Sequence, residues 1–224
     1  MKLLSVLGEL SGSMGDITAA RNKGGMYLRF RARPTNPQTP KQTAVRERLG
    51  GLSKRWSQFL TEAQRIAWKL LADTYSVVDV LGESRNLTGI AMFNKLNGVL
   101  LNAGESVVYD PPIGMDVSST EALEITTAVG AATDCVLTFS PVLGATEVLY
   151  INGVVNISPA INNVKKLRRF FGVSAASALS PLTFDIPTEF GALVSGAKMS
   201  LMVNRLETTS GALSPGVVVE KIIT

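Results

Sequence analysis

The chain has 224 residues, 46% of them hydrophobic, and a net charge of +4, which is typical of a folded globular protein and excludes a disordered or fibrous one. It contains no histidine and one cysteine, Cys135, so histidine acid–base catalysis, an intramolecular disulfide and a cysteine-based zinc or iron–sulfur site are excluded. No uncharged apolar segment approaches the roughly 20 residues that span a bilayer, so we expect no membrane partner.

Basic residues are concentrated in one part of the chain. Residues 21–69 contain 12 lysines and arginines and two acids, a net charge of +10. A segment with this asymmetry usually meets something acidic, such as nucleic acid, a membrane surface or an acidic protein surface. A solvated helix face carries similar runs of charge, and both interpretations stay open at this point.

Residues 1–38 are predicted to form a glycine-rich hairpin and a basic arm. The residues from Asn22 to Gly25 tolerate a positive φ, which favours a hairpin turn. In the strand predicted over 26–33, alternate residues share a face, so four polar side chains lie opposite an apolar set. Prolines at 34, 37 and 40 then prevent regular strand pairing and favour a stiff, extended linker. The polar face is Tyr27, Arg29, Arg31 and Arg33, and the apolar face is Met26, Leu28, Phe30 and Ala32.

Residues 39–110 are predicted to form a domain of about three helices. Thr39 is the expected N-cap of the first helix, with Pro40 at its first position and Gln42 as the capping-box residue. Gly50-Gly51 weakens the middle of this helix, which permits a kink or break there. An apolar stripe lies at spacings of three and four residues on one face: Val45, Leu49, Leu52, Trp56 and Phe59.

Two further helices follow in this region. Thr61 and Gln64 form a capping box that opens the second helix. Trp56 and Trp68 are expected to clamp the first two helices together as a hairpin, rather than to stack on a ligand. The third helix is predicted to begin at residue 88 or 89 and to end at Gly104. The predicted inner face of the second helix is Ala63, Ile66, Ala67, Leu70 and Leu71.

Residues 111–224 are predicted to form an antiparallel β-sandwich of the immunoglobulin-like or fibronectin-III-like kind. About seven short β-rich runs recur between turn residues, which is the pattern of such a sandwich. The expected fold class of the whole chain is therefore α+β, with an N-terminal β-hairpin and arm, a small helical region and a C-terminal sandwich. The predicted strands are 122–128, 135–139, 147–151, 167–173, 182–186, 198–205 and 217–223.

The sequence contains no recognisable catalytic or cofactor-binding motif. No G-x-x-x-x-G-K-[ST] loop is present, and the N-terminal glycines do not have the spacing of a dinucleotide fingerprint. The carboxylates that lie closest together in the sequence, Asp73, Asp79 and Glu83, are typical of a surface turn. We therefore expect no enzymatic activity, no cofactor and no metal.

The segment 24–73 combines a glycine before a basic strand, the pattern N-P-x-T-x-x-Q-x-x-x-R, and a later W…L-[ST]-x-x-Q-R-x-x-W pattern. This combination resembles a module of uncharacterised structural proteins of phages and prophages, and the resemblance extends to about residue 104. The spacing from tryptophan to leucine is one residue longer here than in the module. The resemblance implies a virion-associated structural role and no active site. The matching residues are Asn36, Pro37, Thr39, Gln42, Arg46, Trp56, Gln64, Arg65 and Trp68.

These observations lead to a hypothesis of assembly. A cationic strand with a stiff linker suits an arm that lies on a neighbouring subunit, where strand pairing supplies affinity and arginines set the register. We expect a minor capsid, decoration or head–tail connector protein, made in the host cytoplasm and located in the virion, where it forms a homo-oligomer and contacts other virion proteins. The candidate partner-binding residues are Tyr27, Arg29, Arg31, Arg33 and Asn36.

Two alternatives stay open. The arm has the charge and one aromatic residue needed to bind the phosphates and a base of a nucleic acid. The predicted sandwich is also a common scaffold for adhesion, so the chain would then bind a glycan or a host surface.

Overall fold

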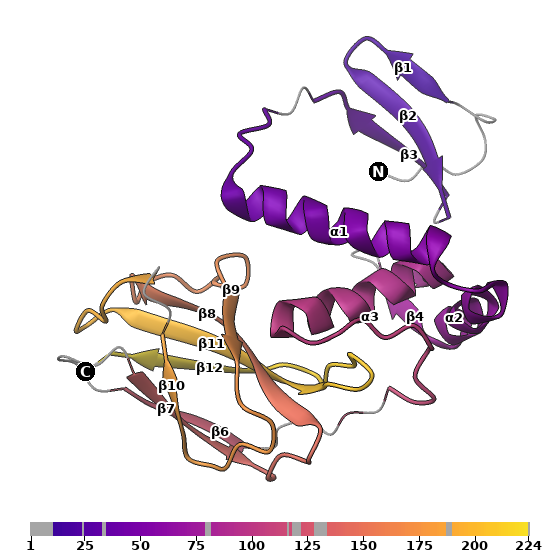
Figure 1. Cartoon of the computed structure of the whole chain (residues 1–224). Helices are drawn as coiled ribbons and strands as arrows, with labels where there is room; N and C mark the ends of the chain where they lie inside the picture. Colours follow the sequence, from indigo (N-terminus) through magenta and orange to yellow (C-terminus); the bar gives the residue numbers. More distant parts are fainter. Residues whose placement is uncertain are drawn as a thin grey trace.

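A computed structural model describes residues 11–23, 25–32, 35–78, 82–115, 117, 122–127, 134–186 and 190–223. The fold is α+β, with three helices and several antiparallel sheets among these residues (Figure 1). The order along the chain is a small N-terminal sheet, a helical region with a two-stranded β-ribbon, and a β-rich C-terminal half, as the sequence predicts.

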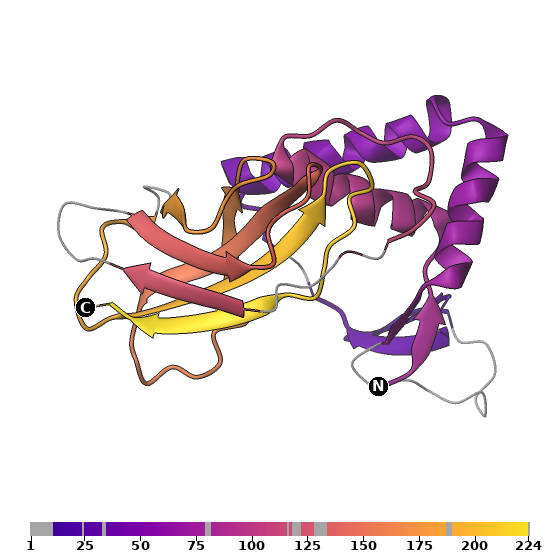
Figure 2. The ribbon, with the colours of Figure 1, turned by 90° about the horizontal axis from the view of Figure 1, so that it is seen from below.

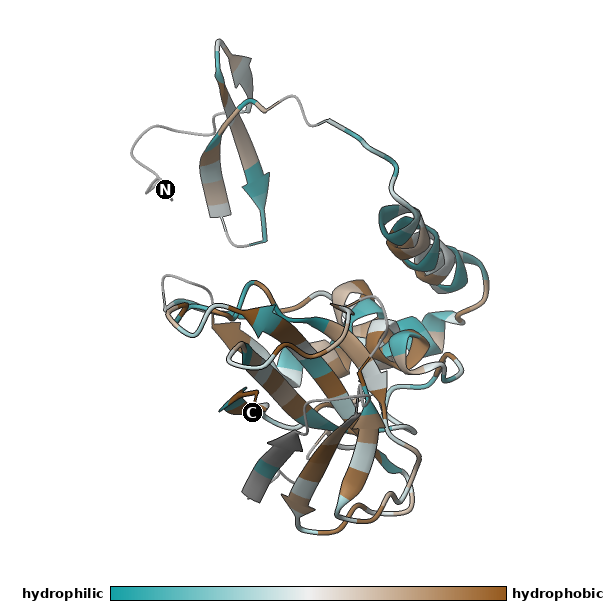
Figure 3. Cartoon of the chain, turned by 90° about the vertical axis from the view of Figure 1, so that its left-hand side faces the viewer, coloured by the Kyte–Doolittle hydropathy of each residue, from teal (hydrophilic) through white to brown (hydrophobic). Residues whose placement is uncertain are grey.

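The N-terminal sheet contains β1 (Gly12–Met14), β2 (Ile17–Asn22) and β3 (Gly25–Phe30) in that spatial order. Gly25 has a φ of +101°, which explains why the turn between β2 and β3 needs glycine at this position. The strand ends at Phe30 rather than at residue 33. A segment without regular secondary structure over 35–39, in which Gln38 has a φ of +49°, leads to the first helix instead of a fully extended linker, and the sheet lies apart from the other two regions (Figure 3).

Three helices and the β4–β5 ribbon form the second region. Helix α1 spans Pro40–Gln58, and its N-cap Thr39 accepts a hydrogen bond from the backbone N–H of Gln42. The helix continues through Gly50-Gly51 without a break, and burial of Leu52 offsets the weak helical propensity of glycine there. The other elements are α2 (Glu62–Thr74), β4 (Ser76–Val78), β5 (Ser84–Asn86) and α3 (Gly89–Ala103).

The caps of α2 and α3 agree with the sequence pattern. Both halves of the capping box form at α2, since the Thr61 hydroxyl accepts from the Gln64 backbone N–H and the Gln64 side-chain oxygen Oε1 accepts from the Thr61 backbone N–H. Thr88 caps α3, and Gly104 ends it in the left-handed conformation with a φ of +84°. These ends form as predicted because capping depends on residues only three or four positions apart.

Helices α1 and α2 each pack on α3, and they do not form the expected hairpin with one another (Figure 2). Trp68 is fully buried, lies edge-on to Phe93 of α3 with the ring centres 5.4 Å apart, and donates its indole N–H to the Tyr109 carbonyl at 2.7 Å. Trp56 is half-buried and packs against the same phenylalanine at 5.6 Å. Phe93 is thus the residue on which both tryptophans converge.

The inner face of α2 differs from the prediction. Ile66 and Leu70 are 52% and 64% exposed, whereas Trp68 and Ala72 are buried. The helix carries apolar residues around more than one face, and α3 packs against the face that contains the larger tryptophan ring. Ile66 and Leu70 are therefore left on the surface.

The C-terminal half contains two antiparallel sheets with the orders β10-β7-β6 and β12-β11-β8-β9. Their inward side chains form one buried cluster that includes Leu137, Ile151 and Leu201. All seven predicted strands are present, with ends shifted by at most a few residues except for β8, which continues well beyond Ile151. The bounds are β6 (Ala122–Thr127), β7 (Asp134–Ser140), β8 (Glu147–Ile157), β9 (Arg169–Val173), β10 (Leu182–Asp185), β11 (Lys198–Glu207) and β12 (Val217–Ile222).

Helix α3 joins the two larger regions. One side belongs to the helical core, and the other packs Val99 and Ala103 on the outer face of the four-stranded sheet, where Val148 and Leu206 are buried. Gly211, in the loop after β11, approaches α3 so closely that a Cβ there would lie 2.7 Å from a backbone oxygen of the helix. The helix therefore holds the C-terminal sheets against the helical region.

Candidate interaction surface

The N-terminal sheet has one apolar and one polar face. Residues opposite each other in a ladder share a face, and Ile17 lies opposite both Met14 and Phe30. Met14 and Phe30 are 87% and 82% exposed, and Ile17 is also exposed. We call these three residues the apolar sheet face. Three neighbouring exposed apolar side chains on a small sheet form a surface that favours contact with another protein.

The predicted partner-binding residues lie on and beyond the other face. Tyr27 is half-buried and lies opposite Ala20, while Arg29 is exposed and lies opposite Thr18. Arg31 follows the end of the strand; its backbone N–H donates to the Asp16 carbonyl at 2.6 Å, and its side chain is exposed. Asn36 is exposed in the segment that precedes α1. Arg33 lies outside the described residues.

The structure therefore brings Tyr27 and Arg29 onto one face, as the alternation predicts. Among the described residues, no ion pair involves Arg29 or Arg31. The side chain of Lys23 connects the sheet with the helical region by donating to the Leu87 carbonyl at 3.2 Å. The guanidinium groups of Arg29 and Arg31 thus remain available to an acidic partner.

A second apolar surface lies between α2 and the segment after α3. A groove of about 640 Å³ runs between the helix and the segment Pro111–Ile113, and the side chain of Ile113 is fully exposed. Asp110 is exposed beside this segment and accepts a hydrogen bond from the Gln64 side chain at 2.8 Å. The groove was not predicted from the sequence, and we call it the α2 groove. It is lined by Ala67, Leu70, Leu71, Thr74, Tyr75, Pro111, Pro112 and Ile113.

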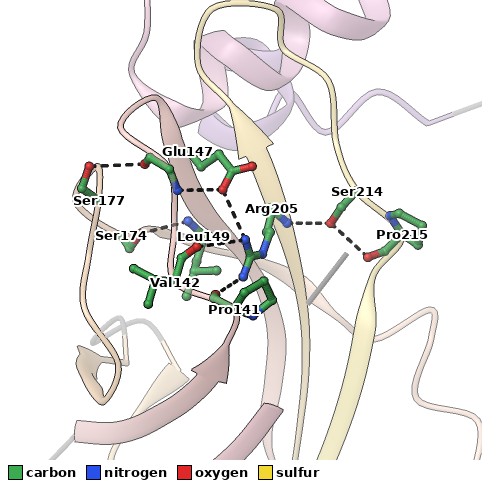
Figure 4. Close-up of polar contacts among 10 residues, drawn as sticks. Pro141, Val142, Glu147, Leu149, Ser174, Ser177, Arg205, Ser214 and Pro215 are labelled. Atoms are coloured by element: carbon green, nitrogen blue, oxygen red, sulfur yellow. Dashed lines mark hydrogen bonds and ion pairs between the residues drawn. The ribbon is translucent and has the colours of Figure 1, made fainter. Parts of the chain in front are cut away.

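Among the described residues, the most deeply buried charge lies at one end of the C-terminal core. Arg205 of β11 is 1% exposed; its guanidinium donates to the carbonyls of Pro141 and Val142 and lies 3.2 Å from the Glu147 carboxylate (Figure 4). The backbone N–H of Arg205 donates to the Ser214 hydroxyl at 2.8 Å. The Arg205 charge is paired with Glu147 and hydrogen-bonded to backbone carbonyls of the same chain. We therefore interpret this cluster as structural rather than as a binding site.

A second polar cluster lies on the outer face of the four-stranded sheet. Lys198 pairs with Glu220, and Arg168 donates to the Ser200 hydroxyl, which in turn donates to Glu220. The hydrogen bond from Lys198 lowers the pKa of the Glu220 carboxyl, and the charges of Lys198 and Arg168 act in the same direction. The side chain of Arg168 is largely buried against the outer face of the sheet.

The described residues contain no arrangement that indicates catalysis. No group of three or more cysteine or acidic side chains that could hold a metal ion occurs among them, and Cys135 is buried in the core. None of the described helices is both long and apolar enough to cross a membrane. Comparisons of the chain with protein-family models, with curated proteins and with solved structures find no match.

Proposed function

We propose that this chain is a non-enzymatic structural protein of a phage particle, of the minor capsid, decoration or head–tail connector kind. It docks on neighbouring virion subunits through its N-terminal sheet and arm. The observation that carries the proposal is the apolar sheet face, which stands apart from both cores with the side chains of Met14 and Phe30 almost fully exposed. A partner that covers this face removes it from water, and the arginines on and beyond the opposite face are available for a second, charged contact.

We further propose that the C-terminal half is a fibronectin-III-like sandwich. Three strands in the order β10-β7-β6 enclose a common core with four strands in the order β12-β11-β8-β9. In a constant-type immunoglobulin domain the fourth strand joins the sheet of the first two strands, whereas here β9 pairs with β8. This pairing supports the fibronectin-III-like alternative, and the sandwich forms the outward part of the subunit in the particle.

Incorporation into particles tests the proposed function. A variant with Arg29, Arg31 and Arg33 changed to glutamate, and a second with Phe30→Asp, should fold with the thermal stability of the wild type, because the described members of this set are exposed. Both should be absent from purified particles when they are supplied in place of the wild-type protein. Leu179→Asp, at an exposed apolar residue of the C-terminal half, is the matched control and should be incorporated normally.

The nucleic-acid alternative has one observation in its favour, the shared face of Tyr27 and Arg29. The same arginine variant separates the two functions. If it is still incorporated into particles but loses salt-dependent binding to DNA or RNA, the arm contacts the genome and the proposed docking function is wrong.

A further inference from the structure

We propose that the polar cluster on the outer face of the four-stranded sheet binds an anionic group of the phosphate or sulfate class. The cluster consists of Arg168, Lys198, Ser200 and Glu220, with Lys221 at its rim. This inference goes beyond the proposed function, because it concerns the C-terminal half and holds whether or not the N-terminal sheet docks on a virion protein.

The cluster contains more positive than negative charge. The side chains of Arg168 and Lys198 are 9% and 11% exposed, and among the described residues they share Glu220 as their only counter-ion. Lys221 is exposed beside Glu220 and has no ion-pair partner among the described residues. Three cations and one carboxylate give a net charge of +2, and an excess of largely buried positive charge favours an added anion.

The cluster also has hydrogen-bond donors to spare. Nε and Nη2 of Arg168 donate to the Ser200 hydroxyl at 3.2 and 3.0 Å, and no described acceptor contacts Nη1. Lys198 donates to the Ile161 carbonyl at 3.2 Å and pairs with Glu220, which leaves one proton of its ammonium without a described acceptor. Charge-assisted bonds from such donors are the strong ones in phosphate recognition.

A cavity beside these groups has room for the anion. Its volume is about 200 Å³, which is the space of several waters and is sufficient for one tetrahedral oxyanion. Helix α3 leaves this part of the sheet open, because Lys198 begins β11 whereas the helix packs on Leu206 near the other end of that strand. The cavity is lined by Pro159, Lys198, Glu220, Lys221 and Ile222.

The sequence around the cluster is basic although the C-terminal half is not. Residues 111–224 contain seven basic and nine acidic residues, and six of the seven basic ones lie either in 165–169 or at Lys198 and Lys221. Lys165 and Lys166 are exposed in a turn directly before Arg168. A group carried on an acidic polymer would contact this turn as well as the cavity, whereas a free ion would occupy the cavity alone.

The first experiment measures thermal unfolding of the full chain in sodium sulfate and in sodium chloride of equal ionic strength. Glu220→Gln leaves Arg168 and Lys198 without their counter-charge, so this variant should be less stable than the wild type in chloride. Sulfate should raise its Tm by more than that of the wild type, because a bound sulfate replaces the lost carboxylate. The wild type measures the general stabilising effect of sulfate.

Two double variants show where the sulfate binds. Adding Lys221→Gln to Glu220→Gln should abolish the extra rise in Tm, because it removes a cation of the cavity. Adding Lys54→Gln instead removes the same charge at an exposed position of α1 and should leave the extra rise unchanged. An equal rise in Tm for Glu220→Gln and for the wild type would overturn the proposal.

The second experiment needs no change at a buried ion pair. In a sulfate titration of the wild type, the backbone amide NMR signals of Ser200 and Lys221 should shift to saturation, and Lys221→Gln should bind at least about tenfold more weakly. Signals that do not shift beyond the effect of chloride, or an unchanged affinity of Lys221→Gln, would overturn the proposal. Because none of these variants changes the N-terminal sheet, failure here leaves the proposed function standing.

Dextran sulfate, followed through the same NMR signals, distinguishes the two sources of the anionic group. If Lys165→Gln/Lys166→Gln weakens the binding of dextran sulfate but not of sulfate, the site takes a group carried on an acidic polymer. If it weakens neither, the site takes a free anion. Uncharged dextran should cause no shift, and a shift with uncharged dextran equal to that with dextran sulfate would contradict recognition of charge.

Discussion

Arg205 closes the end of the C-terminal core where β7 leads into β8. Its side chain projects from β11 on the same face as Leu201 and Val203, which are core residues. The guanidinium satisfies two carbonyls of the connection after β7 and pairs with Glu147. A planar group with five donors can meet these three acceptors together, and a lysine ammonium cannot reproduce that geometry.

Arg205→Met should therefore destabilise the protein by roughly 3–5 kcal/mol, because it leaves the Glu147 carboxylate without its counter-charge and the two carbonyls without the guanidinium donor. The double variant Arg205→Met/Glu147→Leu removes the unpaired charge and should recover part of this loss. Urea unfolding of both variants and the wild type measures the effect. A loss below about 1 kcal/mol for the single variant would show that the cluster is solvated and not structural.

The two tryptophans of the helical region should differ in their contribution to stability. Trp68→Ala creates a cavity at a fully buried site and removes the hydrogen bond to Tyr109, so a cost of roughly 3–5 kcal/mol is expected. Trp56 is half-buried, so Trp56→Ala should cost clearly less. Thermal unfolding of the two variants in the full chain measures which substitution costs more stability. Equal losses of stability would contradict the packing described for Phe93.

At the scale of elements, α3 contributes side chains both to the helical core and to the cluster on the outer face of the four-stranded sheet. Val148 on the outer face of β8 is buried in part by Val99 and Ala103 of this helix. Residues 111–224 expressed alone should give a β-type circular dichroism spectrum and a cooperative melt, because the core between the two sheets is complete without the helix. The outer face of the four-stranded sheet would then be open to water.

The substitution Val148→Thr should have different effects in the full chain and in residues 111–224 alone. In the full chain the added hydroxyl is buried under α3, so the variant should lose about 1–3 kcal/mol of stability. In residues 111–224 alone the same side chain is solvated, and the substitution should have little effect. A helical or unfolded spectrum for residues 111–224, or equal losses in both contexts, would contradict the role assigned to α3.

The elements that the sequence predicts correctly depend on local signals. The strand alternation around Tyr27 and the caps at Thr39 and Thr61 involve residues within a few positions, and they are present in the structure. β8 is longer than predicted because Gly153 continues the strand at a point where a Cβ would clash with the Leu201 and Phe171 side chains. Within a single sequence, this need for glycine is indistinguishable from a turn signal.

Long-range packing could not be predicted in the same way. The buried face of α2 depends on where α3 lies, and α2 has enough apolar residues to satisfy more than one orientation. The α2 groove combines this helix with a segment about forty residues later in the chain, so no sequence window contains both walls. The apolar sheet face was partly predictable, since alternation places Phe30 opposite the arginines, but the exposure of Met14 follows only from its pairing in β1.

At the scale of the whole molecule, a net charge of +4 conceals a strongly basic segment followed by an acidic one. The basic segment includes β3, the linker and α1; the N-terminal sheet and α1 form one side of the molecule in Figure 1. The C-terminal sheets lie on the other side. The proposed docking part is thus the basic side of the molecule, as expected of a subunit that is held at one end.

Quantitative mass spectrometry of purified phage particles tests the central claim most directly. The protein should be present in a fixed ratio to the other particle proteins, and it should remain after nuclease treatment and a high-salt wash, because the apolar sheet face supplies most of the affinity. Absence from purified particles, together with abundance in the lysate of the producing cells, would contradict a structural role in the virion.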